Sequence, residues 1–408
     1  MEMTAPTRRG MLTGTAALTG TAALTGLGLL APAAQAAPPP KDHGRRHGTY
    51  REQELAWAGY QGVRNFRIPA LAVTPGGDLV AAFDKRPVGG DAPAPNSIWQ
   101  RRSRDGGATW EEPTVIAAGT ETGARTGYSD PSYVVDRKTG MIFCFHVFSK
   151  DVGVWNSGYG DDDADRGIIS AAVSCSEDDG QTWTTRLITS VVKPESCRAM
   201  FASSGAGIQL RYGPHAGRLV QQFAGWFRQN DGSQLVQAYS VFSDDHGESW
   251  TMGQPVGESM DENKVAELSD GTLMMNSREN RRTGHRWIAY SRDGGETWED
   301  LHRDPHLVDP GNNAHITRAY PDAPQGSAKA KVLLFSHADA QPSARVNGTI
   351  EYSEDDGRTW IRKRVFQPGA CQYSVIVPTG RGTYALAYEG AGETIMVASL
   401  DMNWILSR

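Results

Sequence analysis

Cysteines and recognisable metal-binding motifs are scarce in this sequence. The 408 residues include only 4 cysteines, which lie far apart and never in a C-x-x-C spacing: Cys144, Cys175, Cys197 and Cys371. None of the 10 histidines belongs to an H-E-x-x-H motif, so we expect neither a zinc site nor another cofactor. Oxidation of all the cysteines would allow three disulfide pairings, and free buried thiols are an equal alternative.

A strong charge of one sign and long apolar runs are also lacking. The formal net charge is −6, from 41 Lys and Arg against 47 Asp and Glu, and this mild acidity argues against nucleic acid as a partner. The apolar stretch 12–31 is too rich in Gly and Thr for a convincing membrane span. No later run reaches the ~18 apolar residues that a spanning helix needs, so we expect no membrane partner.

The first 48 residues have the features of an export signal and a linker. Residues 1–36 contain a twin-arginine-like motif (TRRGML), then an apolar stretch, then a small-residue cleavage site (AQA). Residues 37–48 are Pro-rich and charged, which favours a disordered lead-in. We expect residues 49–408 to form one folded domain of a secreted, extracellular protein.

Helical periodicity is hard to find after residue 50. The chain contains 46 Gly and 22 Pro, and its apolar runs are short, as in LVAAF, MIFCF and KVLLF. Short runs bounded by turn residues are typical of antiparallel sheet. The sequence therefore predicts an all-β fold.

One turn pattern, S-x-D-x-G-x-[ST]-W, occurs five times. The copies read SRDGGATW from Ser103, SEDDGQTW from Ser176, SDDHGESW from Ser243, SRDGGETW from Ser291 and SEDDGRTW from Ser353. Each follows a strand-like run, so each is expected to close a hairpin, with the aspartate accepting backbone N–H bonds and the glycine supplying a positive φ. The aspartates would otherwise be catalytic or calcium-binding, but five equivalent copies suit a repeated structural unit better.

The spacing of these boxes favours a propeller. They start 48 to 73 residues apart, which is enough for four strands and long loops per unit. Residues 361–408, after the last box, fit the strands that close the ring, and an N-terminal strand would complete the last blade. We expect one box per blade.

The boxes and the segment Asn65-Phe66-Arg67-Ile68-Pro69 together resemble bacterial sialidases (exo-α-neuraminidases), which carry an F-R-I-P motif near their start. The resemblance covers nearly all of residues 49–408. It implies a six-bladed β-propeller catalytic domain, with the active site at one end of the central channel and the boxes at the other.

The resemblance also implies a set of residues that binds the carboxylate of the substrate. Arg67, Arg278 and Arg345 match the arginine triad of the family, and Glu389 matches the glutamate that holds the first arginine. Planar guanidinium groups offer paired donors that fit a carboxylate, so three of them select an acidic sugar.

The expected catalytic residues are Tyr373 as nucleophile, Glu262 as its base and Asp91 as the acid/base. Sialic acid carries its carboxylate on the anomeric carbon, where a neutral phenol avoids the repulsion that an attacking carboxylate would meet. A phenol of pKa near 10 needs a base at neutral pH, and Glu262 is preferred to the adjacent Asp261. Asp91 lies on a Gly/Pro-rich loop that can close over a substrate.

Residues around the sugar ring follow from the same resemblance. Arg86 and Asp130 are expected to line the side of the ring substituents. The acetamido pocket should be apolar, and its candidates are Phe148, Trp155 and Phe201.

The implied protein is a monomeric, secreted exo-α-sialidase that hydrolyses terminal sialic acids on glycoproteins, glycolipids and oligosaccharides with retention of configuration. A trans-sialidase, a hydrolase of a related eight- or nine-carbon keto-acid sugar, and a non-catalytic glycan-binding propeller are the alternatives. Linkage preference stays open.

Overall fold

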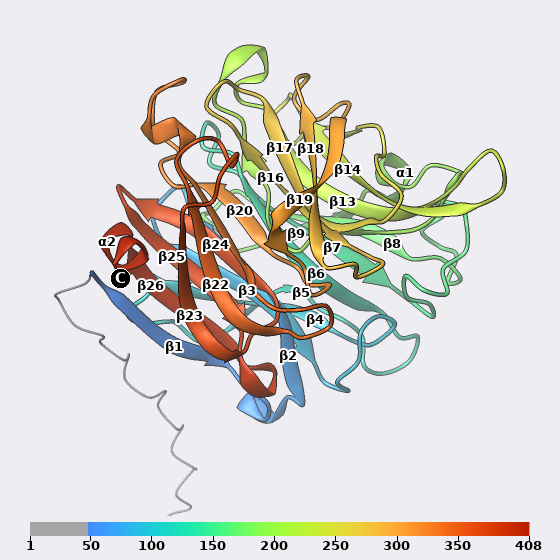
Figure 1. The fold of residues 1–408 in the computed structure, drawn as a ribbon. Coiled ribbons are helices and arrows are strands. Elements are labelled where there is room, and N and C mark those ends of the chain that lie inside the picture. The colour runs from blue at the N-terminus through green and yellow to red at the C-terminus, as the bar shows by residue number, and fades with distance from the viewer. Residues whose placement is uncertain (1–47, 408) are drawn as a thin grey trace, which may run out of the picture. The chain divides into compact units, whose positions relative to one another are not determined.

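A computed structural model describes residues 48–407 of the chain. These residues form six separate, mainly antiparallel sheets around a central channel, which is the six-bladed β-propeller that the sequence predicts (Figure 1). The expected export signal, residues 1–36, and nearly all of the expected lead-in, residues 37–48, lie outside the described residues. Within residues 48–407 no helix has the length and apolar character to cross a membrane.

The first three blades follow one another along the chain, each with its strands given from the channel outward. Blade 1 consists of β2 (Asn65–Val73), β3 (Leu79–Arg86), β4 (Ser97–Ser103) and β5 (Thr114–Ala117). Blade 2 consists of β6 (Gly127–Val135), β7 (Ile142–Ser149), β8 (Ser170–Ser176) and β9 (Thr184–Leu187), with β11 (Gly205–Ala206) parallel to β6. Blade 3 consists of β10 (Cys197–Ala202), β13 (Leu219–Arg228), β14 (Gln234–Ser243) and β15 (Thr251–Met252), with β12 (Ile208–Gln209) also paired to β13.

The remaining blades complete the ring. Blade 4 consists of β16 (Met260–Glu267), β17 (Leu273–Glu279), β18 (His285–Ser291) and β19 (Glu299–Val308). Blade 5 consists of β20 (His315–Arg318), β21 (Leu333–Ala338), β22 (Val346–Ser353) and β23 (Arg362–Ala370). Blade 6 consists of β24 (Ser374–Gly380), β25 (Thr383–Glu389), β26 (Ile395–Asp401) and β1 (Tyr50–Ala56). The described α-helices are short: α1 (Thr189–Val192) and α2 (Met402–Leu406).

Blade 6 joins the two ends of the described chain. Its outermost strand, β1, pairs with β26 from Tyr50 opposite Leu400 to Ala56 opposite Ile395, and Figure 1 shows the blue strand beside the red one. The boxes lie in the hairpins between the third and fourth strands of the other five blades. In blade 6 those two strands come from opposite ends of the chain, so no hairpin connects them, and this explains five boxes in six blades.

The hydrogen bonds of each box join residues of the same turn. In the copy that starts at Ser176, the serine Oγ accepts a hydrogen bond from Gly180 N–H (2.8 Å) and donates one to Asp178 (2.8 Å). Asp178 accepts from the backbone N–H of Thr182 (2.8 Å) and from its hydroxyl. The other four copies have the same bonds, and the five glycines have φ between +78° and +97°. The predicted hairpin role is confirmed.

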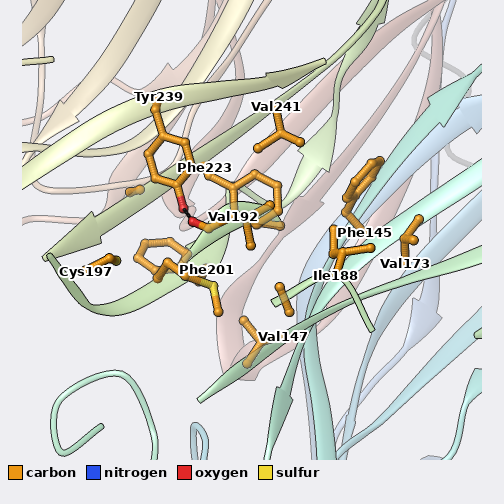
Figure 2. Close-up of a cluster of buried hydrophobic side chains, with 14 of the residues drawn as sticks. Phe145, Val147, Val173, Ile188, Val192, Cys197, Phe201, Phe223, Tyr239 and Val241 are labelled. Carbon is orange, nitrogen blue, oxygen red and sulfur yellow. Dashed lines mark hydrogen bonds between the residues drawn. The ribbon is translucent and has the colours of Figure 1, made fainter. Parts of the chain in front are cut away.

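The core lies between neighbouring blades, as Figure 2 shows for blades 2 and 3. Phe145 and Val147 of β7 pack with Phe223 of β13 and Tyr239 of β14, all of them buried. The Tyr239 hydroxyl donates to the Val192 carbonyl at 2.8 Å, so the one polar atom that this ring buries is satisfied. This hydrogen bond joins β14 of blade 3 to α1, the helix that follows blade 2 in the chain.

The box tryptophans extend this packing. Trp250 of the blade 3 box meets Phe143 and Phe145 of blade 2 edge to face, with ring centroids 5.4 and 4.7 Å apart. The box therefore ties its own hairpin to the adjacent blade. All four cysteines are free thiols in the structure, which is one of the two states that the sequence left open.

The inner strands run in one direction and give the channel two different ends. The end where they begin, with Arg67, Glu262 and Tyr373, is termed the front mouth, and the end where they finish, with Glu267 and Arg318, the rear mouth. Because strands alternate in direction, the third strand of each blade also finishes at the rear, which places the boxes there. The candidate site and the boxes are thus at opposite ends, as expected.

The box hydrogen bonds predict a stability effect that is separate from activity. Asp178→Ala removes the acceptor of four bonds within its turn and should lower the Tm by about 2–4 °C. Glu177→Ala, a loss of the same charge at an exposed position of the same turn, should change the Tm by about 1 °C or less. Calorimetry compares the two variants, and equal shifts would show that the box bonds contribute no stability.

Candidate active site

A cavity of ≈ 260 Å³ opens at the front mouth. Its lining includes eight of the nine residues that the sequence singled out: Arg67, Arg86, Asp91, Asp130, Glu262, Arg278, Arg345 and Tyr373. They come from blades 1, 2, 4, 5 and 6. The ninth residue, Glu389, is bonded to Arg67 at the edge of the cavity. The structure therefore brings all of these residues together, while their roles stay predictions.

A break in the strand pairing directs side chains into the cavity. In β2 the register shifts between Arg67 and Ala70, and Ile68 has φ +63°. A positive φ is unfavourable for a β-branched residue, so the surrounding contacts must hold it. Ile68 N–H donates to Glu389 at 2.6 Å. The same device recurs in β6, where Asp130 has φ +63° beside a register shift.

Arg67 and Glu389 form a buried bidentate pair. The Arg67 Nε and Nη2 atoms lie 2.8 and 3.0 Å from the two Glu389 oxygens, and the Glu389 side chain is 0% exposed. Burial would lower the pKa of Arg67, but Glu389 outweighs it and raises that pKa. The predicted supporting contact is present, and it keeps the guanidinium charged and fixed.

Gln372 connects two of the three arginines and was not found by sequence reasoning. Its Oε1 atom accepts from Arg67 Nη2 at 3.2 Å and from Arg345 Nη1 at 3.1 Å. Arg345 also donates to the Gly311 carbonyl at 2.9 Å. A glutamine has no local sequence signal for such a role, apart from its position beside Tyr373. Through it the two guanidinium groups share one neutral acceptor.

Tyr373 lies against both the third arginine and the expected base. Arg278 Nη1 is 2.5 Å from Glu262 Oε2 and 3.3 Å from the Tyr373 hydroxyl, and the phenol also bonds to Glu262. Burial and the charge of Glu262 raise the pKa of Tyr373 well above 10. Burial would raise the pKa of Glu262, but Arg278 outweighs it and lowers that pKa. A protonated phenol thus touches an ionised proton acceptor.

Asp261, the neighbour of Glu262, lies in a different environment. Its carboxylate is 3.7 Å from Arg278 Nε, and burial raises its pKa. The carboxyl group bonded to the phenol is that of Glu262, and its role as the base stays a prediction.

A second cluster of charged side chains, centred on Arg86, lines another part of the cavity. Arg86 donates to Asp84 through Nε (3.1 Å) and Nη2 (2.8 Å), and its Nη1 bonds to Asp91. The Asp130 N–H donates to Asp84 at 3.0 Å, and burial together with the charge of Asp84 raises the pKa of Asp130. Asp84 was missed because it reads as a mid-strand residue. The Asp91 side chain is 78% exposed and faces the opening.

One side of the cavity is apolar. Phe201, an expected pocket residue, lines it together with Val147 and Trp226. Trp155, a second expected residue, lies at the rim, 64% exposed, with its ring 5.4 Å from that of Trp226. Phe148 does not line the cavity and stacks on Tyr128 at 5.0 Å instead.

One group of described side chains has ligand atoms near enough for a metal ion: His337, Asp339 and Glu351 on blade 5. The Lys363 ammonium lies 2.7 Å from Asp339 and 3.2 Å from Glu351. This ammonium supplies the positive charge that a metal ion would bring, and the group lies outside the front cavity.

Comparison with known proteins places the chain in a family. Residues 77–386 match the model of the BNR repeat-like domain. A sialidase of Micromonospora viridifaciens is 52% identical over 357 residues, which cover 87% of this chain and 54% of the relative. A sialidase of Bacteroides fragilis strain YCH46 is 30% identical over 304 residues, covering 72% of this chain and 54% of the relative. The chain spans about half the length of these curated relatives.

Solved structures agree with the architecture. The Hadza microbial sialidase Hz136 has a TM-score of 0.77 and 30% identity, covering 87% of this chain and 69% of that one. A leech intramolecular trans-sialidase has a TM-score of 0.73 over 86% of this chain and 70% of its own. Its 19% identity supports a shared fold only.

The pair between Arg67 and Glu389 predicts an asymmetry between two glutamates that face the same arginine. Glu389→Gln leaves a buried guanidinium without its counter-charge and should cost about 3–5 kcal/mol of folding free energy. Glu393→Gln removes a half-exposed partner at 3.9 Å and should cost about 1 kcal/mol or less. Denaturant unfolding measures both, and a smaller loss for Glu389→Gln than for Glu393→Gln would contradict the buried pairing.

Proposed function

Because this chain belongs to the BNR repeat-like domain family and within it to the bacterial sialidases, we propose that it is an exo-α-sialidase that removes terminal sialic acids with retention of configuration. The observation that carries the proposal is the convergence of three guanidinium groups and one phenol on a single cavity: Arg67, Arg278, Arg345 and Tyr373. The substrates would be sialylated glycoproteins, glycolipids and oligosaccharides.

Substrate recognition follows from the charge of the front cavity. Arg67 and Arg345 share Gln372 as a neutral acceptor, so part of their donor capacity is free for an incoming carboxylate. The apolar side, with Phe201 and Trp226, fits an acetamido methyl group. Asp130, whose pKa is raised by burial and by the charge of Asp84, lines the cavity where the sugar hydroxyls would lie.

In the first step the bond between the anomeric carbon and the leaving oxygen breaks. Asp91 gives its proton to that oxygen, while Tyr373 Oη attacks the anomeric carbon and passes its proton to Glu262. The product of this step is a sialyl-tyrosine intermediate. Arg278, which contacts both Glu262 and the phenol oxygen, lowers the cost of the negative charge that passes between them.

In the second step water replaces the phenol. Asp91, now a carboxylate, removes a proton from the water, whose oxygen attacks the anomeric carbon. The bond to Tyr373 Oη breaks, and Glu262 returns the proton to the phenolate. Two displacements on one carbon restore the α configuration.

We also propose that the protein acts outside the cell as a monomer. The twin-arginine-like motif and the AQA cleavage site in residues 1–36 support export. Free thiols at all four cysteines are compatible with a chain that is exported already folded.

Tyr373→Phe should reduce kcat/KM for an unactivated substrate such as 3′-sialyllactose by about 10²-fold or more, because the ring remains but the nucleophilic oxygen is lost. Tyr290→Phe, at a half-buried tyrosine on β18, is the matched control and should keep full activity. Circular dichroism verifies that both variants fold. Wild-type turnover by a folded Tyr373→Phe enzyme would refute the nucleophile assignment.

The anomer first released from a sialoside tests retention independently. Proton NMR should detect the α anomer before mutarotation, and initial release of the β anomer would contradict two displacements. Lactose added to the same reaction separates the alternatives, since a trans-sialidase would form a new sialoside. Binding of sialosides without any hydrolysis would identify a glycan-binding propeller.

A further inference from the structure

A second cavity, of ≈ 120 Å³, lies at the rear mouth of the channel. Its wall is formed where the inner strands finish, and it includes Gln209, Glu267 and Thr317 together with three arginines. On β16, Glu262 belongs to the front cavity and Glu267 to the rear one. Five residues of extended strand separate them, which is about 17 Å at ~3.3 Å per residue. The rear cavity is therefore a separate site and not an extension of the front one.

The arginines of the rear cavity are Arg137, Arg211 and Arg318. Arg318 is 6% exposed, and its Nη1 atom is buried without a hydrogen-bond partner. Its other terminal nitrogen, Nη2, donates to the Pro321 carbonyl at 3.0 Å. Within residues 48–407 Arg137 has no carboxylate partner in an ion pair, and it lies exposed at the rim. Arg137 therefore lines the cavity without a carboxylate partner, beside the buried Arg318.

Fewer carboxylates than arginines lie at the rear cavity. Glu267 lies 3.3 Å from Arg318, but its oxygens already accept the backbone N–H groups of Arg211 and Tyr212 at 2.8–3.0 Å. Asp322 pairs with Arg211 at 2.8 Å, and its side chain is 81% exposed to solvent. Three guanidinium groups therefore face one buried carboxylate, whose bonds are occupied, and one solvated carboxylate.

The two mouths differ in how their arginines are compensated. At the front mouth, nearby carboxylates overcome burial and raise the pKa of Arg67 and of Arg278. At the rear mouth, burial lowers the pKa of Arg318 in spite of Glu267. Burial and then the charge of Arg211 lower the pKa of Arg137. The arginines of the rear cavity therefore have less compensating carboxylate charge than the arginines of the front cavity.

We propose that the rear mouth binds a small oxyanion, a carboxylate or a phosphate, between Arg137, Arg211 and Arg318. Paired N–H donors of guanidinium groups match the oxygens of either anion, and a bound anion would supply the negative charge that this arginine group lacks. The cavity volume suffices for a small anion, since a single water needs only about 10–15 Å³ by the same kind of measure. This site does not depend on the proposed sialidase activity.

Isothermal titration tests the proposal with inorganic phosphate and with acetate, at constant ionic strength, on the full chain. Arg137→Gln combined with Arg211→Gln removes the two rim arginines and leaves the buried Arg318 in place, so the fold should persist. Lys138→Gln removes the same type of charge from the adjacent position, where the ammonium contacts His246 at 3.2 Å and does not line the cavity. Thermal unfolding verifies that each variant is folded.

The double variant should bind the tighter of the two anions at least tenfold more weakly than the wild type, while Lys138→Gln keeps wild-type affinity. Anion binding at the front mouth is measured separately, as inhibition of sialoside hydrolysis, and should be the same in all three proteins. Tighter binding of acetate would identify a carboxylate site, and tighter binding of phosphate a phosphate site. Unchanged binding by the folded double variant, or no binding of either anion by the wild type, would overturn the proposal.

Discussion

The carboxylate of Glu389 is the contact on which the front cavity depends. It holds the Arg67 guanidinium in a bidentate pair and accepts the N–H of Ile68. It also lies 3.4 Å from the N–H of Tyr373. Arg67 belongs to blade 1 and Tyr373 to the entry of blade 6, so one side chain sets the arginine and the phenol in their relative positions. Without this carboxylate the positive φ of Ile68 would have no compensating bond.

Two carboxyl groups of the same cavity have pKa values shifted in opposite directions, because their surroundings differ. Glu262 lies beside Arg278 and has a lowered pKa, whereas burial raises the pKa of Asp130. One cavity thus shifts the pKa values of two carboxyl groups in opposite directions. Both are positioned by breaks in the pairing of the inner strands, which turn polar side chains toward the channel while the rest of each strand stays in its sheet.

The sequence predicts a feature correctly where the interactions join residues close in the chain, or where a family motif identifies the residue. The box at Ser176 was predictable because its bonds lie within eight residues, and Arg67 because the F-R-I-P segment identifies it. Gln372 was missed because its partners, Arg67 and Arg345, lie far from it in the sequence, and Asp84 because a mid-strand aspartate carries no local signal. Phe148 is absent from the cavity because neighbouring strand residues face opposite sides, and Val147 takes the cavity side.

The closure of the ring by β1 on β26 has a consequence for biogenesis. Tyr50 and Leu400 pair across the seam, so a ribosome must release almost the whole domain before its first strand finds a neighbour. Until then β26 presents an open edge, a template for pairing with other chains. Blade 6 is therefore the last blade to be completed, and the edge of β26 stays open until β1 pairs with it.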